Sequence, residues 1–417
     1  MSERIRVAAA IAAALFLGGC GNLIPPYQRP AAPVAASFPQ ETTPASVAGV
    51  PVAADIEWQR FFADPRLQRL IGIALRNNRD LRIAVLNIEQ ARAAYQVRRA
   101  DELPSVGVGA AVQRQPGSTG KLVNTYSVGL ALASYELDLF GRVRSLSQAA
   151  LAQYLATDEA RKAVQISLIS TLANTYMSQL ADDELLRVTR QTLVTREDSL
   201  KLTKLKFDYG AASELDYRQA ESLLESARAS LAQALRQRAL DEDTLVLLAG
   251  QPLPADLPAP LALNAQQLST DLPAGLPSDL LERRPDIRAA EQQLISANAN
   301  IGAARAAFFP RISLTGNFGT ASTELSGLFR SGSFAFTGAG QLLQPLFDAG
   351  RNQANLEVAK VAREITVAQY ERAIQSAFRE VSDALAGRAT FGEQLRAQVA
   401  QAHAEEVRFR LSDLRYR

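Results

Sequence analysis

The sequence is poor in the side chains that build metal and redox sites, because its 417 residues include one cysteine and one histidine. Cys20 has no partner within the chain for a disulfide bond, and His403 has no second imidazole with which to bind zinc. We therefore expect no metal and no cofactor. His403 lies among charged and small residues in a helical pattern, where a solvated side chain is the ordinary outcome.

The chain also lacks a charge bias and a long apolar run. Its 45 basic and 43 acidic residues give a net charge of +2, which argues against a nucleic-acid-binding surface. After the N-terminal leader no window reaches about 18 consecutive apolar residues, so no transmembrane helix is expected. The segment Gly117–Lys121 lacks the spacing of a phosphate-binding loop, and no other catalytic constellation is present. We expect no enzyme activity.

The N-terminus carries the first positive signal. Arg4 and Arg6 precede an apolar segment, Val7–Leu17, that is too short to anchor a protein across a bilayer and is typical of a secretion signal. The stretch Leu17-Gly18-Gly19-Cys20 resembles a bacterial lipobox, after which the cysteine becomes an acylated N-terminus. By the same resemblance, Gly21 directs the protein to the outer membrane. The alternative is a generic leader in which the cysteine is incidental.

Two parts of the sequence resemble each other. The segments that start at Asn78 and Arg283 each run as a helical pattern into a proline and then into an alternating strand pattern. Further on, Gly141-Arg142 is matched by Gly350-Arg351, an offset of 209 residues (350 minus 141). A period of about 200 residues indicates a tandem duplication and not a solenoid. Each copy is expected to contain a helix, a hairpin and a very long helix.

The expected helices carry coiled-coil seams. Residues 142–207 contain no proline or glycine, which predicts on the order of 100 Å of helix, and residues 351–417 form a counterpart of similar length. A large soluble bundle is the alternative interpretation. Apolar and small residues recur at spacings of four and three, at Leu70, Ala74, Asn77, Leu81, Ala84, Ile88, Ala91 and Tyr95, and at Ile287, Ala290, Leu294, Ala297, Ile301, Ala304 and Phe308.

The expected hairpins, 104–139 and 310–347, alternate apolar residues with small or polar ones. This pattern suits strands that face lipid on one side and a lumen on the other, although a half-buried soluble sheet has it too. Four strands cannot close a barrel, and no strand edge can stay open in lipid, so a membrane location requires an oligomer. The expected lipid-facing residues are Val106, Val108, Val112, Val128, Leu130, Leu132, Ile312, Leu314, Phe318, Phe334 and Phe336.

An ordered set of short motifs then carries a family resemblance. On these residues the chain resembles the outer membrane efflux proteins, the TolC/OprM-like channels of tripartite RND pumps, and among them the NodT-type lipoproteins. The resemblance covers nearly the whole chain. The motifs are Trp58–Leu67, Asn78–Leu81, Glu136–Arg142, Arg283–Ile287, Phe309–Ile312 and Pro345–Arg351.

The resemblance implies an α+β membrane protein. A long antiparallel coiled-coil α-barrel would extend into the periplasm, and four β-strands per chain would contribute to a trimeric 12-stranded β-barrel in the outer membrane. The implied partners are two further copies of the chain, a periplasmic membrane-fusion adaptor, an inner membrane RND pump and outer membrane lipid, with Cys20 carrying a lipid such as palmitate. No nucleic acid is implied.

The implied function is a passive conduit for drugs or other small molecules from the periplasm to the exterior. One alternative is a type I secretion or metal-efflux channel, and another is a non-conducting lipoprotein that spans the periplasm. The resemblance also locates Asp208, Tyr209, Asp216, Arg415, Tyr416 and Arg417 near the periplasmic helix tips, where the family holds its closed state with hydrogen bonds and ion pairs. Screened surface contacts worth under about 1 kcal/mol are the alternative.

The expected organisation has five parts. They are a signal peptide over 1–19, a Pro/Ala-rich acylated tether over 20–55, a first repeat over 56–250, a Pro-rich connector over 251–278 and a second repeat over 279–417. Four residues mark the expected junctions between strands and helices. Gly141 and Gly350 stand where a strand turns into a helix, and Pro104 and Pro310 stand where a helix turns into a strand and a backbone N–H donor is absent. The first repeat has an additional helix at roughly Glu214–Leu248 without a counterpart in the second, so we expect a C-terminally truncated form whose gate residues would lie past Arg417.

Overall fold

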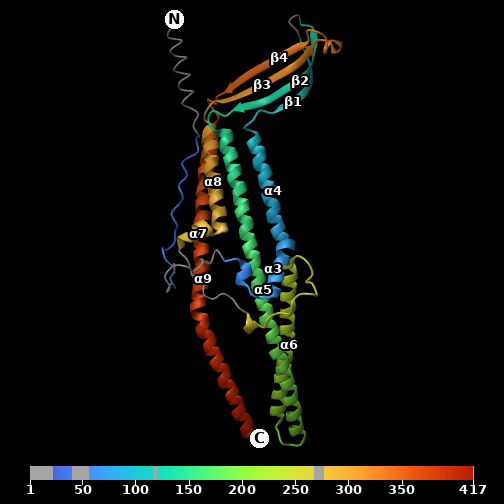
Figure 1. Cartoon of the computed structure of the whole chain (residues 1–417), viewed down its shortest axis with the longest axis vertical. Coiled ribbons are helices and arrows are strands. Elements are labelled where there is room, and N and C mark those ends of the chain that lie inside the picture. Colours follow the sequence, from blue (N-terminus) through green and yellow to red (C-terminus); the bar gives the residue numbers. More distant parts are fainter. Residues whose placement is uncertain (1–21, 40–55, 117–119, 267–276, 417) are drawn as a thin grey trace. The chain divides into compact units, whose positions relative to one another are not determined.

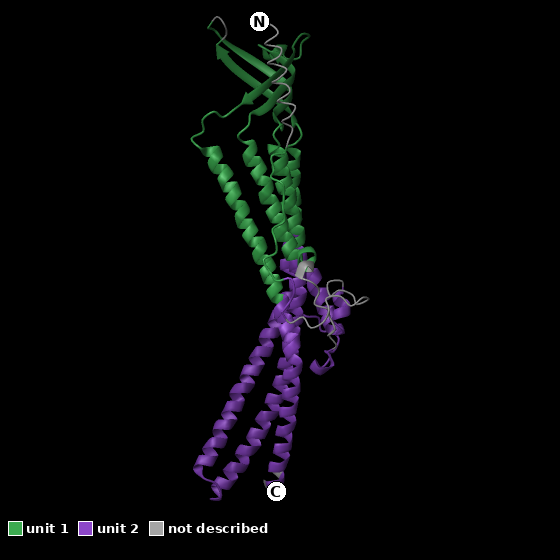
Figure 2. Cartoon of the chain, turned by 90° about the vertical axis from the view of Figure 1, so that its left-hand side faces the viewer, with its two compact units in different colours: residues 1–35, 87–159, 280–380 green, residues 36–86, 160–279, 381–417 purple. Residues whose placement is uncertain are grey.

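The computed structural model of the chain describes residues 22–39, 56–116, 120–266 and 277–416. Cys20 and Arg417 lie outside these residues, and the side chain of Tyr416 is not described. Two compact units are present. Unit 1 comprises residues 1–35, 87–159 and 280–380, and unit 2 comprises residues 36–86, 160–279 and 381–417 (Figure 2).

The elements follow the duplicated order of helix, hairpin and long helix (Figure 1). The first copy contains α2 (Trp58–Phe61), α3 (Pro65–Asn77), α4 (Arg79–Ala100), β1 (Val106–Pro116), β2 (Leu122–Leu137), α5 (Arg142–Asp208) and α6 (Glu214–Ala249). The second contains α7 (Pro277–Arg283), α8 (Pro285–Ala306), β3 (Arg311–Ser322), β4 (Phe334–Leu343) and α9 (Arg351–Tyr416). Two short 3-10 helices lie in the connections of the described part of the chain, η2 (Leu263–Ala265) and η3 (Leu325–Gly327).

The first seam does not run along one helix, which corrects the sequence-based expectation. Asn78 has an extended backbone with φ −60° and ψ 133°, so α3 ends before it and α4 begins after it. Its side-chain oxygen accepts a hydrogen bond from the Leu81 N–H at 2.9 Å, and its side-chain nitrogen donates to the Leu248 carbonyl of α6 at 3.0 Å. An asparagine satisfies a free helix N-terminus better than it continues a helix, which explains the break.

The four strands found in the described residues form one antiparallel sheet in unit 1, in the order β1-β2-β3-β4. The two hairpins are therefore joined side by side through β2 and β3. The ladder between these strands shifts register between Leu132 and Tyr135, and Ser134 in that interval has a positive φ of 31°. This β-bulge was not expected from the alternating sequence. Within the described residues β1 and β4 are edge strands, each paired on one side.

Each unit has its own hydrophobic core. In unit 2, α3, α5 and α6 bury Leu67, Leu70, Leu172, Tyr176 and Leu245, which are at most 1% exposed. In unit 1, Ile287 and Leu294 of α8 pack with Tyr370, Ile374 and Ala377 of α9. These positions recur at helical spacings of three, four and seven, and each buried large side chain contributes on the order of 2 kcal/mol.

Candidate functional site: the sheet, its helix junctions and the helix tip

The sheet presents one continuous apolar face. Directly paired residues on adjacent strands point to the same side, and Val108 pairs with Leu130, which pairs with Phe318. Phe318 pairs in turn with Phe336. The register brings all eleven residues expected to face lipid to this side of the sheet. After the bulge, Tyr135 of β2 pairs with Leu314 of β3, so the apolar face continues past the bulge. Val108 is 81% exposed and Phe336 is 69% exposed.

The opposite face carries small and polar residues. Gly129 of β2 pairs with Gly319 of β3, and a Cβ atom on either glycine would collide with the backbone of the other strand. Glycine is therefore required at both positions for this close approach of the strands. A sheet with one wide apolar face and one small-residue face can separate lipid from water.

A cluster of charged residues joins the first hairpin to its long helix. The Arg142 guanidinium donates two hydrogen bonds to the Glu136 carboxylate, at 2.7 Å each, and the Arg311 Nε atom donates to the same carboxylate at 2.5 Å. Asp138 caps the start of α5 by accepting from the Val143 and Arg144 N–H groups at 3.0 and 2.8 Å. Capping and ion pairing together fix where the strand ends and the helix begins.

The four junction residues named from the sequence lie at these transitions. Pro104 and Pro310 precede β1 and β3, while Gly141 and Gly350 precede α5 and α9 with φ angles of 73° and 83°. Asp348 caps α9 by accepting from the Gly350 and Asn352 N–H groups at 3.0 and 2.9 Å. The positive φ angles explain why glycine stands at both helix entrances.

The turn between α5 and α6 is fixed by local contacts. Asp208 pairs with Lys204 of its own helix at 3.1 Å. Asp216 forms a capping box with Ser213, accepting its N–H at 3.1 Å, and hydrogen bonds from Ser213 lower the pKa of Asp216. Tyr209 is 81% exposed. The structure thus brings Asp208, Tyr209 and Asp216 to one turn but gives Asp208 an intrahelical partner, and Arg415 lies exposed near the end of α9.

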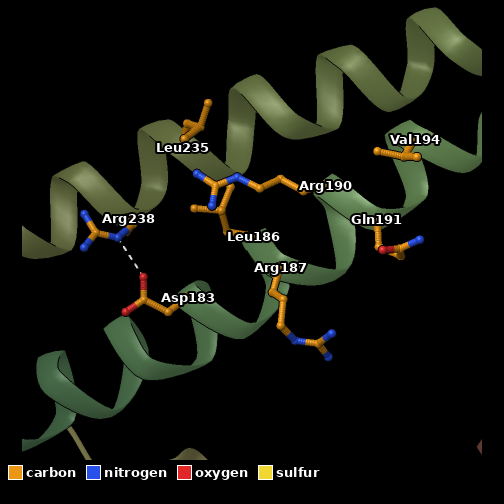
Figure 3. Close-up of a pocket in the computed structure, with 8 residues that line it drawn as sticks. All are labelled: Asp183, Leu186, Arg187, Arg190, Gln191, Val194, Leu235 and Arg238. Atoms are coloured by element: carbon orange, nitrogen blue, oxygen red, sulfur yellow. Dashed lines mark hydrogen bonds and ion pairs between the residues drawn. The ribbon is translucent and has the colours of Figure 1, made fainter. Parts of the chain in front are cut away.

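A polar cleft of about 570 Å³ lies between α5 and α6 (Figure 3). Arg238 of α6 bridges to Asp183 of α5 at 2.7 Å, and Arg190 reaches over Leu186 toward Leu235. At this cleft, charged side chains lie among the apolar residues at the contact between α5 and α6. No sequence motif pointed to these residues.

Sequence reasoning also missed a buried carboxylate. Asp64 is 1% exposed and caps α3 by accepting from the Arg66 N–H at 2.8 Å. It also accepts from the Tyr176 hydroxyl at 2.8 Å and from the Gln266 amide at 2.7 Å. Burial acts to raise the pKa of Asp64, but the hydrogen bonds outweigh it and hold this pKa below its ordinary value. Asp64-Pro65 is a helix-start signal, but its partners lie too far along the chain to be predicted.

No group of three or more His, Cys, Asp or Glu side chains in the described part of the chain could hold a metal ion. None of the helices within the described ranges is long and apolar enough to cross a membrane.

Comparisons with known proteins agree with the sheet and helices. The model of a family described as outer membrane efflux protein matches residues 70–251 and 276–417. The chain is 47% identical over 414 residues to the antibiotic efflux pump outer membrane protein ArpC of Pseudomonas putida, and equally to the toluene efflux pump outer membrane protein TtgC of that species. Each match covers 97% of this chain and 85% of the relative.

A solved structure shares the fold. The open state of the Neisseria gonorrhoeae MtrE outer membrane channel superposes with a TM-score of 0.85 at 44% sequence identity. The match covers 95% of this chain and 88% of that one.

Proposed function

This chain belongs to the outer membrane efflux protein family, and we propose that three copies of it close a twelve-stranded channel through the outer membrane. It is an outer membrane component of an efflux pump, with helices that extend into the periplasm, and it is not an enzyme. These statements confirm the family, the fold class, the function and the location expected from the sequence.

One observation carries the trimer proposal. The sheet exposes a wide apolar face while its edge strands β1 and β4 each have one unpaired side in the described residues. In lipid both edges must be paired, and a second and third copy supply matching edges. Two copies would give a barrel of eight strands, and side chains fill the interior of a barrel of that size. Three copies give twelve strands and leave room for an aqueous lumen lined by the small-residue face.

In this channel the eleven apolar residues of the sheet would face lipid, and the opposite, small-residue face would line the lumen. Cys20 is proposed as the acylation site that ties the chain to the membrane, with palmitate as one acyl group. The proposed partners are a periplasmic adaptor and an inner membrane RND pump that energises transport, because a passive conduit needs no energy source of its own. The residues at the α5–α6 turn and near the end of α9 are proposed to contribute to the closed state.

The cargo is proposed to be small and largely apolar. The two relatives are named for antibiotic and toluene efflux, which favours small organic molecules over secreted proteins or metal ions. Channel selectivity would come from the width and the lining of the lumen, since no group of His, Cys, Asp or Glu side chains in the described residues could hold a metal ion.

The duplication predicts the register of the proposed contact between neighbouring chains. β1 corresponds to β3 with an offset of 206 residues, as Pro104 corresponds to Pro310 (310 minus 104). Val106 of β1 pairs with Leu132, and the corresponding Ile312 of β3 pairs with Leu342, so Leu132 corresponds to Leu342. Leu132 of β2 pairs with Gly316 of β3. At the unpaired edges of β4 and β1, the corresponding residues are Leu342 and Ala110 (316 minus 206). Leu342 of one chain is therefore expected to lie beside Ala110 of the next chain.

Oxidative cross-linking tests this register. In a Cys20→Ser chain, the double variant Ala110→Cys, Leu342→Cys is expected to yield a covalent species of three chains. The matched control, Ala111→Cys with Leu342→Cys, moves one thiol to the opposite face and is expected to cross-link poorly. Membrane-inserted protein that stays monomeric, or equal cross-linking by the control, would contradict the proposal.

A further inference from the structure

Two charged residues stand on the face of α6 that packs against α5. The buried and partly buried residues of this face recur at intervals of three and four, at Leu224, Ala227, Leu231, Ala234, Arg238, Asp241 and Leu245. Leu245 shares a core with Leu172 of α5, and Arg238 bonds to Asp183 of α5 at 2.7 Å (Figure 3). Asp241 lies between these two contacts and therefore also faces α5.

Asp241 is buried with one oxygen atom unsatisfied. It is 9% exposed, and the Gln237 side-chain nitrogen donates to its Oδ1 atom at 3.2 Å. Its Oδ2 atom is buried as well, and no donor within the described residues reaches it. A buried carboxylate oxygen that has lost water and gained no hydrogen bond is costly, so a donor or a cation is expected at this point.

The group that meets Asp241 across the helix contact is a second carboxyl, that of Asp182 on α5. The two side chains lie within hydrogen-bonding reach of each other. Ionised carboxylates only accept hydrogen bonds, so a bond between two carboxyls requires one proton. Burial raises the pKa of Asp182, and the hydrogen bond to Asp241 and the negative charges of Asp241 and Asp183 raise it further.

The surroundings of the pair on α6 and α3 do not neutralise it. Arg238, one turn from Asp241, is held by Asp183 at 2.7 Å and by Glu242 at 2.8 Å. The α3 residues that share a core with Leu245 are all apolar, namely Leu67, Leu70, Ile71 and Ala74.

The cations of α5 are also placed elsewhere. Arg187 pairs with Glu184 of the same helix at 2.7 Å. Arg190 stands eight residues along α5 from Asp182, a rise of about 12 Å. Since no group of three or more His, Cys, Asp or Glu side chains in the described residues could hold a metal ion, a proton is the cation that fits between the two carboxyls.

We propose that Asp182 and Asp241 form a proton-binding site, in which one shared proton joins α5 to α6. With the proton bound, the Asp182 O–H group donates to the Asp241 Oδ2 atom, and the pair carries a single negative charge. When the proton leaves to water, two negative charges face each other in the helix contact and repel. The contact is therefore strongest at acid pH, and it weakens as the pH rises above the ordinary value of 3.8 and through the raised pKa of Asp182 in the folded chain.

This pH response is opposite in sign to that of Asp64, whose pKa is lowered in the folded chain. The pair lies on the two helices that end at the turn with Asp208 and Asp216, so a bound proton would hold the two arms of that turn together. Because these helices extend into the periplasm, the site would titrate with the periplasmic pH. Its effect on the closed state rests on the proposed function of the turn, whereas the proton site itself does not.

Distance measurements between spin labels test the proton site. In the full chain with Cys20→Ser, labels at Thr195→Cys on α5 and Ser226→Cys on α6 occupy exposed positions between the acid pair and the turn. Dilution with unlabelled chain removes signals between copies. The distance distribution is expected to be narrow at about pH 4 and to broaden several-fold by about pH 8, as the proton leaves.

Matched variants make the outcome specific. Asp182→Asn places a permanent amide donor beside Asp241 and is expected to keep the distribution narrow at every pH. Asp241→Asn places the amide on the other helix and is expected to do the same. Asp243→Asn makes the same exchange at an exposed position of α6 and is expected to respond to pH as the parent chain does.

Infrared spectroscopy detects the proton itself. The parent chain is expected to show a protonated carboxyl that persists above the pH range in which exposed acids ionise, and Asp182→Asn is expected to remove it. A parent chain whose distances do not respond to pH, a full response in both Asp182→Asn and Asp241→Asn, or the lack of that carboxyl signal would overturn the proposal. Neither measurement needs conductance, so a failed proton site is distinguishable from a failed channel.

Discussion

The two copies of the duplicated unit both use a buried carboxylate to bind a segment that is distant in the sequence, but they satisfy that carboxylate differently. Asp64, in the first copy, accepts hydrogen bonds from Tyr176, Gln266 and backbone N–H groups and pairs with no cation in the described contacts. Glu291, in the second, pairs with Arg29 and accepts from Tyr27. The first copy relies on neutral hydrogen-bond donors, and the second relies on an ion pair whose arginine side chain is 45% exposed.

The long helices of the two copies also differ in how much of their apolar surface is covered. The far half of α5 is paired with α6, in which Leu224 is 4% exposed, whereas the far half of α9 leaves Phe391, Leu395 and Phe409 more than 60% exposed. A repeated sequence pattern thus specifies the helices, while the stability of each helix depends on the surface against which it packs.

The largest effect is expected from removing the carboxylate of the first copy. Asp64→Ala deletes a helix cap and leaves the buried Tyr176 hydroxyl and Gln266 amide without their acceptor, so the free energy of unfolding should fall by about 3 kcal/mol. Denaturant titration followed by circular dichroism measures it. The control Asp256→Ala removes an exposed acid and should change little. Equal losses in the two variants would show that Asp64 has no special role.

A pair of leucine truncations tests the difference between the long helices. Leu224→Ala removes a side chain of α6 that is 4% exposed, leaves a cavity there, and should lower the free energy of unfolding by about 2–3 kcal/mol. Leu395→Ala removes a side chain that is 62% exposed and should cost about 0.5 kcal/mol or less. The same denaturant titration compares them, and a larger loss at Leu395 would mean that the distal part of α9 is covered in the assembled protein.

A smaller effect is expected for the carboxylate of the second copy. Glu291→Ala breaks the fork to Arg29, whose side chain is 45% exposed, so solvent screening limits the loss to about 1–2 kcal/mol. The thermal unfolding midpoint should therefore shift less than in Asp64→Ala. A shift as large as that of Asp64→Ala would contradict the contrast between the two clusters.

The smallest predicted effect is a pH dependence that belongs to the first copy. The pKa of Asp64 is lower in the folded chain than its ordinary value of 3.8, so its contribution to stability is complete above that value and is lost as the pH falls through the folded pKa. Asp64→Asn should flatten the acid side of the stability profile below about pH 4. Thermal unfolding across acidic buffers measures this, and a profile unchanged by the substitution would contradict it.

Local patterns predicted much of the fold. The absence of proline and glycine from 142–207 indicated the helix that the structure has over Arg142–Asp208. The alternation of Val106, Val108 and Val112 indicated the exposed apolar face of the sheet. Both features arise from residues near one another in sequence, where helical and strand periods are visible.

The features that could not be predicted depend on distant partners or on single residues. Asp64 meets Gln266 across 202 positions and Glu291 meets Arg29 across 262, and no period connects such pairs. The break at Asn78 and the bulge at Ser134 each interrupt an otherwise regular pattern at one point. In these places a side-chain hydrogen bond or a strand register outweighs local propensity.

Single-channel recording in planar lipid bilayers distinguishes a channel from a structural protein, because a hollow assembly conducts ions and a solid one does not. Stepwise conductance is expected from the three-chain species held by the Ala110→Cys, Leu342→Cys cross-link. A correctly folded, membrane-inserted three-chain species without conductance, including after the α5–α6 turn is loosened by Asp208→Ala and Asp216→Ala, would contradict it.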